Sequence, residues 1–147
     1  MNNMRILGID YGNARVGLAV SDALGITAQG LETIHYNGND KVVLKRLQEV
    51  VDEYDIKTIV IGMPYNMNGT SSERVEITKK FIHKLNCKFP KIDVVEIDER
   101  LTTVAAHKTM NFLDVNKNKK RNIVDTISAI YILEIYMNKK QNNHCNS

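Results

Sequence analysis

Three strand-like segments follow one another at the start of the chain, with only a few residues between them. Apolar residues alternate or run continuously over 5–11, 15–21 and about 26–35. Gly12 and Asn13 separate the first two segments, and both residue types tolerate the positive φ angles that we expect in a tight turn. We also expect Gly30 to mark a β-bulge. The chain is therefore predicted to begin as a three-stranded antiparallel sheet.

Helices and strands alternate in the rest of the chain. The periodicity predicts strands over Thr58–Ile61 and Ile92–Ile97, with residues 62–70 and 112–120 as loops. The expected helices are Asp40–Tyr54 opened by Asp40, a helix to Lys88 opened by the capping box Thr70-Ser71-Ser72-Glu73, one from Thr102 or Thr103 to Asn111, and Arg121–Met137. Strand–helix–strand units add parallel strands, so the order predicts a mixed five-stranded sheet with helices on both faces. This is the order of the ribonuclease H-like fold.

Length and composition limit the class of protein. A chain of 147 residues fits one domain, which we place at residues 1–138, followed by a polar tail over 139–147 that we expect to be disordered. Its longest uncharged run, 58–72, contains glycines and a proline and is too short to span a membrane. No signal-peptide pattern opens the chain, and Cys87 and Cys145 have no metal-ligand spacing. We expect a cytoplasmic protein.

The net charge of +3 hides an asymmetry along the chain. Residues 1–56 contain 5 basic and 8 acidic side chains, whereas residues 57–147 contain 15 basic and 9 acidic ones. Five lysines with no acid among them lie between Lys79 and Lys91, and four basic residues lie within 117–121. A solvated surface explains the first group adequately, while the denser second group favours contact with a polyanion.

Three acids stand out by their position. Asp10 interrupts an apolar strand, Glu99 lies at the end of the fifth strand beside Asp98, and Asp125 opens the last helix. Asp98 could simply pair with Arg100, and Asp125 could satisfy a helix dipole. Asp10 is harder to explain structurally, because a charge in a central strand is costly unless it is paired or binds a metal.

Carboxylates that converge from a strand, a strand end and a helix start form an oxygen-rich site. Such a site suits Mg²⁺ or Mn²⁺ and not zinc. Two such ions commonly catalyse phosphodiester hydrolysis, one by activating water and the other by stabilising the leaving oxygen. The basic segment 117–121 directly precedes Asp125, which favours a nucleic-acid substrate.

Four ordered segments resemble the YqgF/RuvX family of Holliday-junction-resolvase-like proteins, usually described as pre-16S rRNA nucleases. They are 10–22 (DYGNARVGLAVSD), 62–70 (GMPYNMNGT), 98–103 (DERLTT) and 124–129 (VDTISA), and the resemblance covers about residues 4–138. It implies a ribonuclease H-like fold and two metal ions. Asp10, Glu99 and Asp125 would be the catalytic and metal-binding acids, with Asp98 as an alternative ligand. The implied substrate-binding residues are Gly12, Asn13, Arg15, Asn68, Gly69, Arg100, Thr102, Thr103, Lys117, Lys119, Lys120 and Arg121.

The leading hypothesis is a metal-dependent nuclease that matures the 5′ end of pre-16S rRNA, in contact with ribosomal particles, as a monomer or weak homodimer. A second hypothesis is a resolvase of branched DNA, which would act as a symmetric dimer. A third, of another class, is a non-catalytic RNA-binding assembly or transcription factor. A sugar-kinase-like ATPase would need two copies of the domain, and the chain is long enough for only one.

Overall fold

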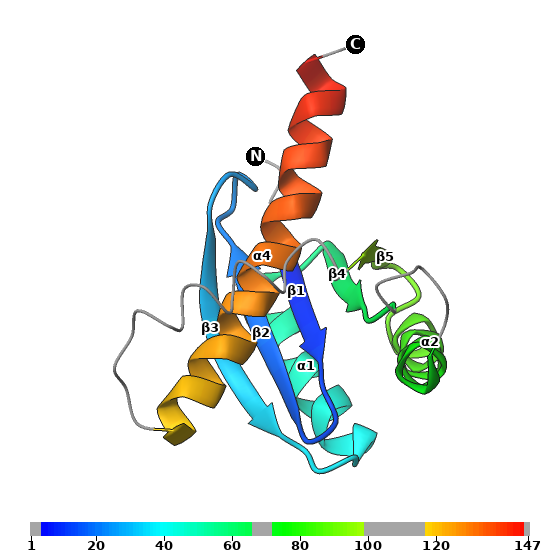
Figure 1. Cartoon of the computed structure of the whole chain (residues 1–147). Helices are drawn as coiled ribbons and strands as arrows, with labels where there is room; N and C mark the ends of the chain where they lie inside the picture. The colour runs from blue at the N-terminus through cyan, green and yellow to red at the C-terminus, as the bar shows by residue number, and fades with distance from the viewer. Residues whose placement is uncertain (1–3, 66–71, 99–116, 146–147) are drawn as a thin grey trace.

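The computed structural model describes residues 4–65, 72–98 and 117–145, and for 117–125 and 141–145 it describes the backbone alone. Figure 1 shows the elements. In chain order they are β1 Ile6–Tyr11, β2 Arg15–Ser21, β3 Ala28–His35, α1 Asp40–Tyr54, β4 Thr58–Met63, α2 Glu73–Lys88, β5 Asp93–Asp98 and α4 Lys117–Cys145. None of the helices in these residues is long and apolar enough to cross a membrane.

The five strands form one mixed sheet in the order β3-β2-β1-β4-β5. The first three strands pair antiparallel, as the short connections predict. β4 and β5 then add parallel to β1 and to each other, so β1 is the middle strand. The predicted mixed sheet is confirmed. β4 continues through Gly62 and Met63, where we expected a loop, because both residues pair with β5 and are buried.

The sheet has two buried faces with different cores. Leu7, Ile9 and Tyr11 of β1 belong to the core beneath α1 and α2. Ile6 belongs to the core beneath α4. Alternation along a strand therefore places Gly8 and Asp10 on the α4 face. In Figure 1, α4 lies across the front of the sheet and α1 lies behind it, which confirms that helices cover both faces.

Turn and capping residues in the sequence predict most boundaries of the strands and helices, and the structure corrects a few of them. The β1–β2 turn forms, but neither Gly12 nor Asn13 has a positive φ. The register between β2 and β3 shifts next to Gly30, so the predicted bulge is confirmed. Asn39, and not Asp40, caps α1, because its side chain accepts the backbone N–H of Lys41. Ser72 caps α2, so the helix starts later than a capping box opened by Thr70 would give.

The last helix is longer than predicted at both ends. α4 begins at Lys117 and ends at Cys145, so the expected loop over 117–120 and the expected disordered tail over 139–145 are both helical. No glycine or proline interrupts this stretch, and extending an existing helix costs far less than starting one. The predicted helix from Thr102 or Thr103 to Asn111 lies outside the described residues.

Candidate active site

Asp10 is the predicted site acid that the structure describes most fully. It is the penultimate residue of β1, it is half-buried, and it pairs across the sheet with Gly17 of β2. β2 pairs with Asp10 itself, and β4 pairs with β1 as far as the preceding residue, Ile9. Gly17 lies on the same α4 face, because its neighbours Val16 and Leu18 belong to the opposite core.

Gly8 sets how closely α4 approaches this face. A Cβ atom at Gly8 would lie 2.8 Å from the carbonyl oxygen of Ala129 and 3.1 Å from the Cβ of Leu133. Ala129 is completely buried. The small residue Ala129 thus lets α4 approach the sheet closely. Gly8 itself was not predicted, although a glycine within an apolar strand is a known signal of close backbone approach.

α4 runs antiparallel to β1, as Figure 1 shows. Met137 lies beside Ile6 in one hollow, and Ala129 and Leu133 lie over Gly8. Asp125 is one helical turn before Ala129, and Asp10 is two strand residues after Gly8. Thr126, the residue after Asp125, lies over Gly30 of β3, so α4 crosses the strands obliquely and its start lies over β3.

Asp98 lies on the opposite face from Asp10. It is in register with Met63, whose side chain belongs to the core beneath α1 and α2. Its neighbour Ile97 instead belongs to the core beneath α4. The structure therefore does not bring the carboxylate of Asp98 to the α4 face.

Several predicted site residues lie outside the described part of the chain. Lys117, Lys119, Lys120 and Arg121 form the first turns of α4, where only the backbone is described. Outside the described residues are Glu99, Asn68, Gly69, Arg100, Thr102 and Thr103. Within residues 4–65, 72–98 and 126–140, no three potential metal-ligating side chains come together.

The turn that follows Asp10 is held in place from several directions. The backbone N–H of Gly12 donates to the carbonyl of Arg15 at 3.0 Å, and a Cβ at Gly12 would lie 2.8 Å from that oxygen. The hydroxyl of Tyr36 donates to the carbonyl of Gly12. Asn13 is exposed at the tip of the turn, and Arg15 begins β2 half-buried. The geometry thus supports Gly12 as a residue that shapes the turn and leaves Asn13 accessible.

Arg74 of α2 reaches the same end of β1. Its Nη2 donates to the carbonyl of Tyr11 at 2.8 Å, and its guanidinium lies 5.5 Å from the centre of the Tyr11 ring. A charged donor to a backbone carbonyl is among the stronger hydrogen bonds. Sequence reasoning missed Arg74, because nothing in its spacing separates it from an ordinary exposed helix residue.

Tyr11 anchors the opposite side of the strand. Its ring stacks on Phe81 with centroids 4.2 Å apart, and its hydroxyl donates to Asp40. Burial, followed by the hydrogen bond to Asp40, raises the pKa of Tyr11 well above its usual value. Lys84 binds the other oxygen of Asp40 at 2.8 Å. Tyr11 is therefore neutral and has a structural role, although it directly follows Asp10 in the chain.

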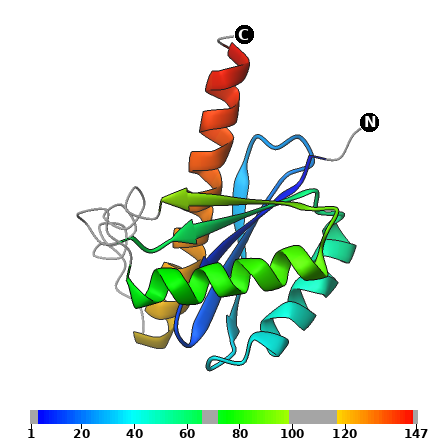
Figure 2. The same ribbon diagram turned by 90° about the vertical axis from the view of Figure 1, so that its right-hand side faces the viewer.

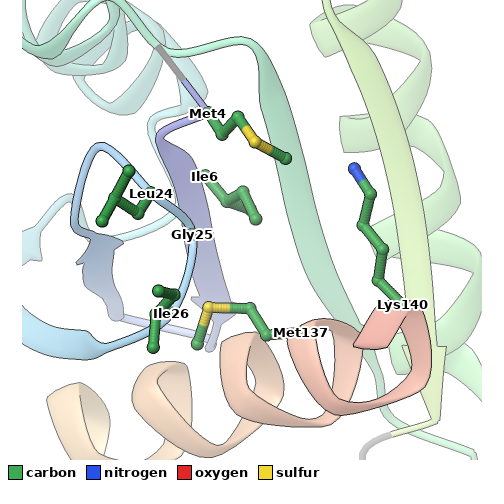
Figure 3. Close-up of a pocket in the computed structure, with 7 residues that line it drawn as sticks. All are labelled: Met4, Ile6, Leu24, Gly25, Ile26, Met137 and Lys140. Carbon is green, nitrogen blue, oxygen red and sulfur yellow. The ribbon is translucent and has the colours of Figure 1, made fainter. Parts of the chain in front are cut away.

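A hollow of about 230 Å³ lies at the far end of β1 (Figure 3). Apolar side chains from the start of β1, the β2–β3 turn and α4 line it, and the one charged group is Lys140: Met4, Ile6, Leu24, Gly25, Ile26, Met137 and Lys140. Among the described residues, no acid and no nucleophile lines this hollow.

The family model RuvX, described as Holliday junction resolvase, matches residues 4–139. The chain belongs to the RuvX family. This confirms the resemblance drawn from the four sequence motifs, and it makes the chain a nuclease, a hydrolase of phosphodiester bonds.

Curated relatives support the same assignment. A protein of Acetivibrio thermocellus named "Putative pre-16S rRNA nuclease" is 50% identical over 137 residues, which is 93% of this chain and 97% of that protein. A protein of a Geobacillus species with the same name is 44% identical over 139 residues, 94% of this chain and all of the relative. Both alignments cover nearly the whole length of this chain and of the relative.

Solved structures confirm the ribonuclease H-like fold. The yeast mitochondrial Holliday junction resolvase Ydc2 is similar with a TM-score of 0.59 at 10% identity, over 98% of this chain and 84% of that chain. The RuvC structure of Thermus thermophilus gives a TM-score of 0.55 at 11% identity, over 95% and 97%. At such identities the likeness concerns the fold alone.

Proposed function

We propose that this nuclease cleaves pre-16S rRNA during ribosome maturation in the cytoplasm, with divalent cations held by Asp10, Glu99 and Asp125. The observation that carries the proposal is the position of Asp10. It lies in the middle strand, on the face of the sheet that is covered by α4, the helix that contains Asp125. The relatives named for pre-16S rRNA, at up to 50% identity over almost the full chain, support the substrate.

The described residues fit a hard divalent cation. Asp10 offers carboxylate oxygens, the ligand type that Mg²⁺ and Mn²⁺ prefer, at a half-buried position on the α4 face. When bound, Mg²⁺ or Mn²⁺ would activate the attacking water and offset the charge that develops on the phosphate.

The residues of the chain have separate roles in this proposal. Asp10 supplies a fixed ligand, because hydrogen bonds to β2 and β4 hold its strand on both sides. Strand alternation favours Glu99 over Asp98 as the second acid, because Asp98 lies on the other face. Arg15, Arg100 and the basic start of α4 over 117–121 would bind phosphates of the substrate.

The test is cleavage of a precursor rRNA that contains the 5′ end of 16S rRNA, with and without Mg²⁺, by the wild-type protein and by Asp125→Asn. The proposal expects metal-dependent cutting by the wild type and at least about a 100-fold loss in the variant, typical of removing one electrostatic group at a reaction centre. Cutting that persists at the wild-type rate in Asp125→Asn contradicts the assigned site. Binding without any metal-dependent cutting would instead support a non-catalytic RNA-binding protein.

A second candidate substrate is a four-way DNA junction, which the description of the matching family favours. Paired, symmetric cuts across a junction require two copies of the site. The same assay with a junction substrate, together with the mass of the protein in solution, separates the two substrates. A monomer that cuts precursor rRNA and leaves the junction intact supports the rRNA assignment.

A further inference from the structure

A basic groove lies between α1 and α2, on the face of the sheet opposite Asp10. It is a hollow of about 460 Å³. We call it the α1/α2 groove, and its lining residues are Lys41, Leu44, Lys45, Gln48, Glu49 and Lys88. The family motifs do not include any of these residues, and neither Asp10 nor Asp125 lines the groove.

Lysines from both helices line the groove: Lys41 and Lys45 of α1, one helical turn apart, and Lys88 of α2. Lys80 and Lys84 precede Lys88 on α2 at the same spacing and extend the row of lysines beyond the groove. All five are exposed. Like charges four residues apart on a helix repel each other, so this arrangement lowers stability slightly in the free protein. It becomes favourable when a polyanion lies along the lysines.

The acids nearest to the groove pair with only one of these five lysines. Asp40 binds Lys84 at 2.8 Å and accepts the hydroxyl of Tyr11, and Glu49 binds Arg46 at 2.7 Å. Within the described residues, no acid forms an ion pair with the other four lysines, Lys41, Lys45, Lys80 and Lys88. The groove therefore keeps a net positive charge that is available to a ligand.

The groove begins at the same end of β1 as the candidate active site. Asp40, at the first turn of α1, contacts Tyr11, which directly follows Asp10. Phe81, which follows Lys80 on α2, stacks on the same tyrosine. A nucleic acid whose cleaved segment lies beside Asp10 on one face can thus continue around the end of the sheet into the groove on the other. Figure 2 shows α1 and α2 seen from the side of the sheet edge.

From these positions we propose that the α1/α2 groove binds the phosphate backbone of the substrate RNA outside the cleaved segment. The inference rests on the proposed function, because it takes RNA as the polyanion. One helical turn, about 5.4 Å, separates successive lysines along each helix. Each lysine can then contact a different phosphate of an extended strand, a mode of binding that needs no particular base sequence. The groove would raise affinity without taking part in the chemical step.

The test compares two double variants that change net charge equally. Lys45→Gln with Lys88→Gln removes one lysine from each wall, and Lys139→Gln with Lys140→Gln removes two exposed lysines from α4 as the matched control. Binding of precursor rRNA is measured in the presence of a chelator over a range of salt concentrations. Single-turnover cleavage with Mg²⁺ is measured separately as a function of enzyme concentration.

We expect the double variant Lys45→Gln with Lys88→Gln to bind precursor rRNA about 25-fold more weakly than wild type at 0.1 M salt. The slope of log affinity against log salt should fall by about 1.4, because each lost phosphate contact contributes about 0.7 for single strands. The half-saturating enzyme concentration should rise in parallel, with the maximal cleavage rate unchanged. Affinity and slope equal to those of the control pair would overturn the proposal. Failure of the wild type to cut rRNA refutes the proposed function instead, and the chelator binding assay still decides the role of the groove.

Discussion

The two faces of the sheet are packed by different kinds of side chain. Beneath α1 and α2 the core is thick, with Tyr11, Leu47 and Phe81 among its large members. Beneath α4 the contact is thin, because Gly8 lies directly under Ala129. Bulky residues on one face secure the sheet, while small residues on the other let a helix approach a strand that presents a carboxylate. Stability and positioning of the site are thus largely separated between the faces.

Phe81→Ala tests the thick face and should have the largest effect on stability. The side chain is completely buried and stacks on Tyr11. Its removal should lower the free energy of unfolding by about 3–5 kcal/mol, measured by urea denaturation. Phe81→Leu, which keeps most of the volume, should cost much less. At urea concentrations below the unfolding transition, the cleavage rate per folded molecule should stay within a few-fold of wild type. A loss of cleavage as large as that of Asp10→Asn would contradict the idea that stability and positioning of the site depend on different faces.

Gly8→Ala tests the thin face with the smallest available change. The added Cβ meets the backbone oxygen of Ala129 at 2.8 Å, so α4 must shift. We expect a stability loss of about 1–3 kcal/mol, typical of overpacking, and a larger proportional loss of cleavage than Phe81→Ala produces. Gly30→Ala is the control, since its Cβ would lie 3.2 Å from the Cβ of Thr126 on the same helix, so α4 need give way by only a few tenths of an ångström. Equal activity in the two variants would show that α4 need not lie so close.

Tyr11→Phe should have the smallest effect on the free energy of unfolding, and that effect should depend on pH. Burial, then the hydrogen bond to Asp40, raises the pKa of Tyr11 above the usual value of about 10. The folded state therefore holds this proton more tightly than the unfolded state, so the tyrosine stabilises the fold fully below pH 10 and less as the pH rises beyond it. At pH 8 the variant should be less stable by about 0.5–1.5 kcal/mol.

The measurement is urea denaturation of wild type and Tyr11→Phe between pH 8 and pH 11. The other tyrosines titrate in both proteins, so the difference between the two curves isolates Tyr11. That difference should shrink above pH 10. A difference that stays constant over the whole range would show that the pKa of Tyr11 is not raised.

The order of strands and helices could be predicted because it depends on local signals. Alternating apolar residues and the turn at Gly12 were sufficient for the antiparallel half, and the apolar run from Thr58 was sufficient for a parallel strand. The length of α4 was not predictable in this way. Polar residues at its two ends carry no apolar stripe, and continuation of a helix depends on the turns already formed.

In the candidate site, too, local signals could be predicted and contacts between distant residues could not. Asp10 could be found from sequence because a charge within an apolar strand has few structural explanations. The contribution of Gly8 depends on which helix crosses it, and the bond from Arg74 to Tyr11 joins residues 63 positions apart. Which of Asp98 and Glu99 shares a face with Asp10 depends on the register of β5 against β4, and a shift of one residue would exchange them.

The most direct test of the account compares Asp10→Asn with Asp98→Asn in Mg²⁺-dependent cleavage of precursor rRNA. Both variants remove one negative charge near the same end of the sheet, but on opposite faces, and circular dichroism confirms the folded fraction of each. The account predicts a loss of at least about 100-fold for Asp10→Asn and a change of only a few-fold for Asp98→Asn. Equal losses in both variants, or wild-type cleavage by Asp10→Asn, would contradict it.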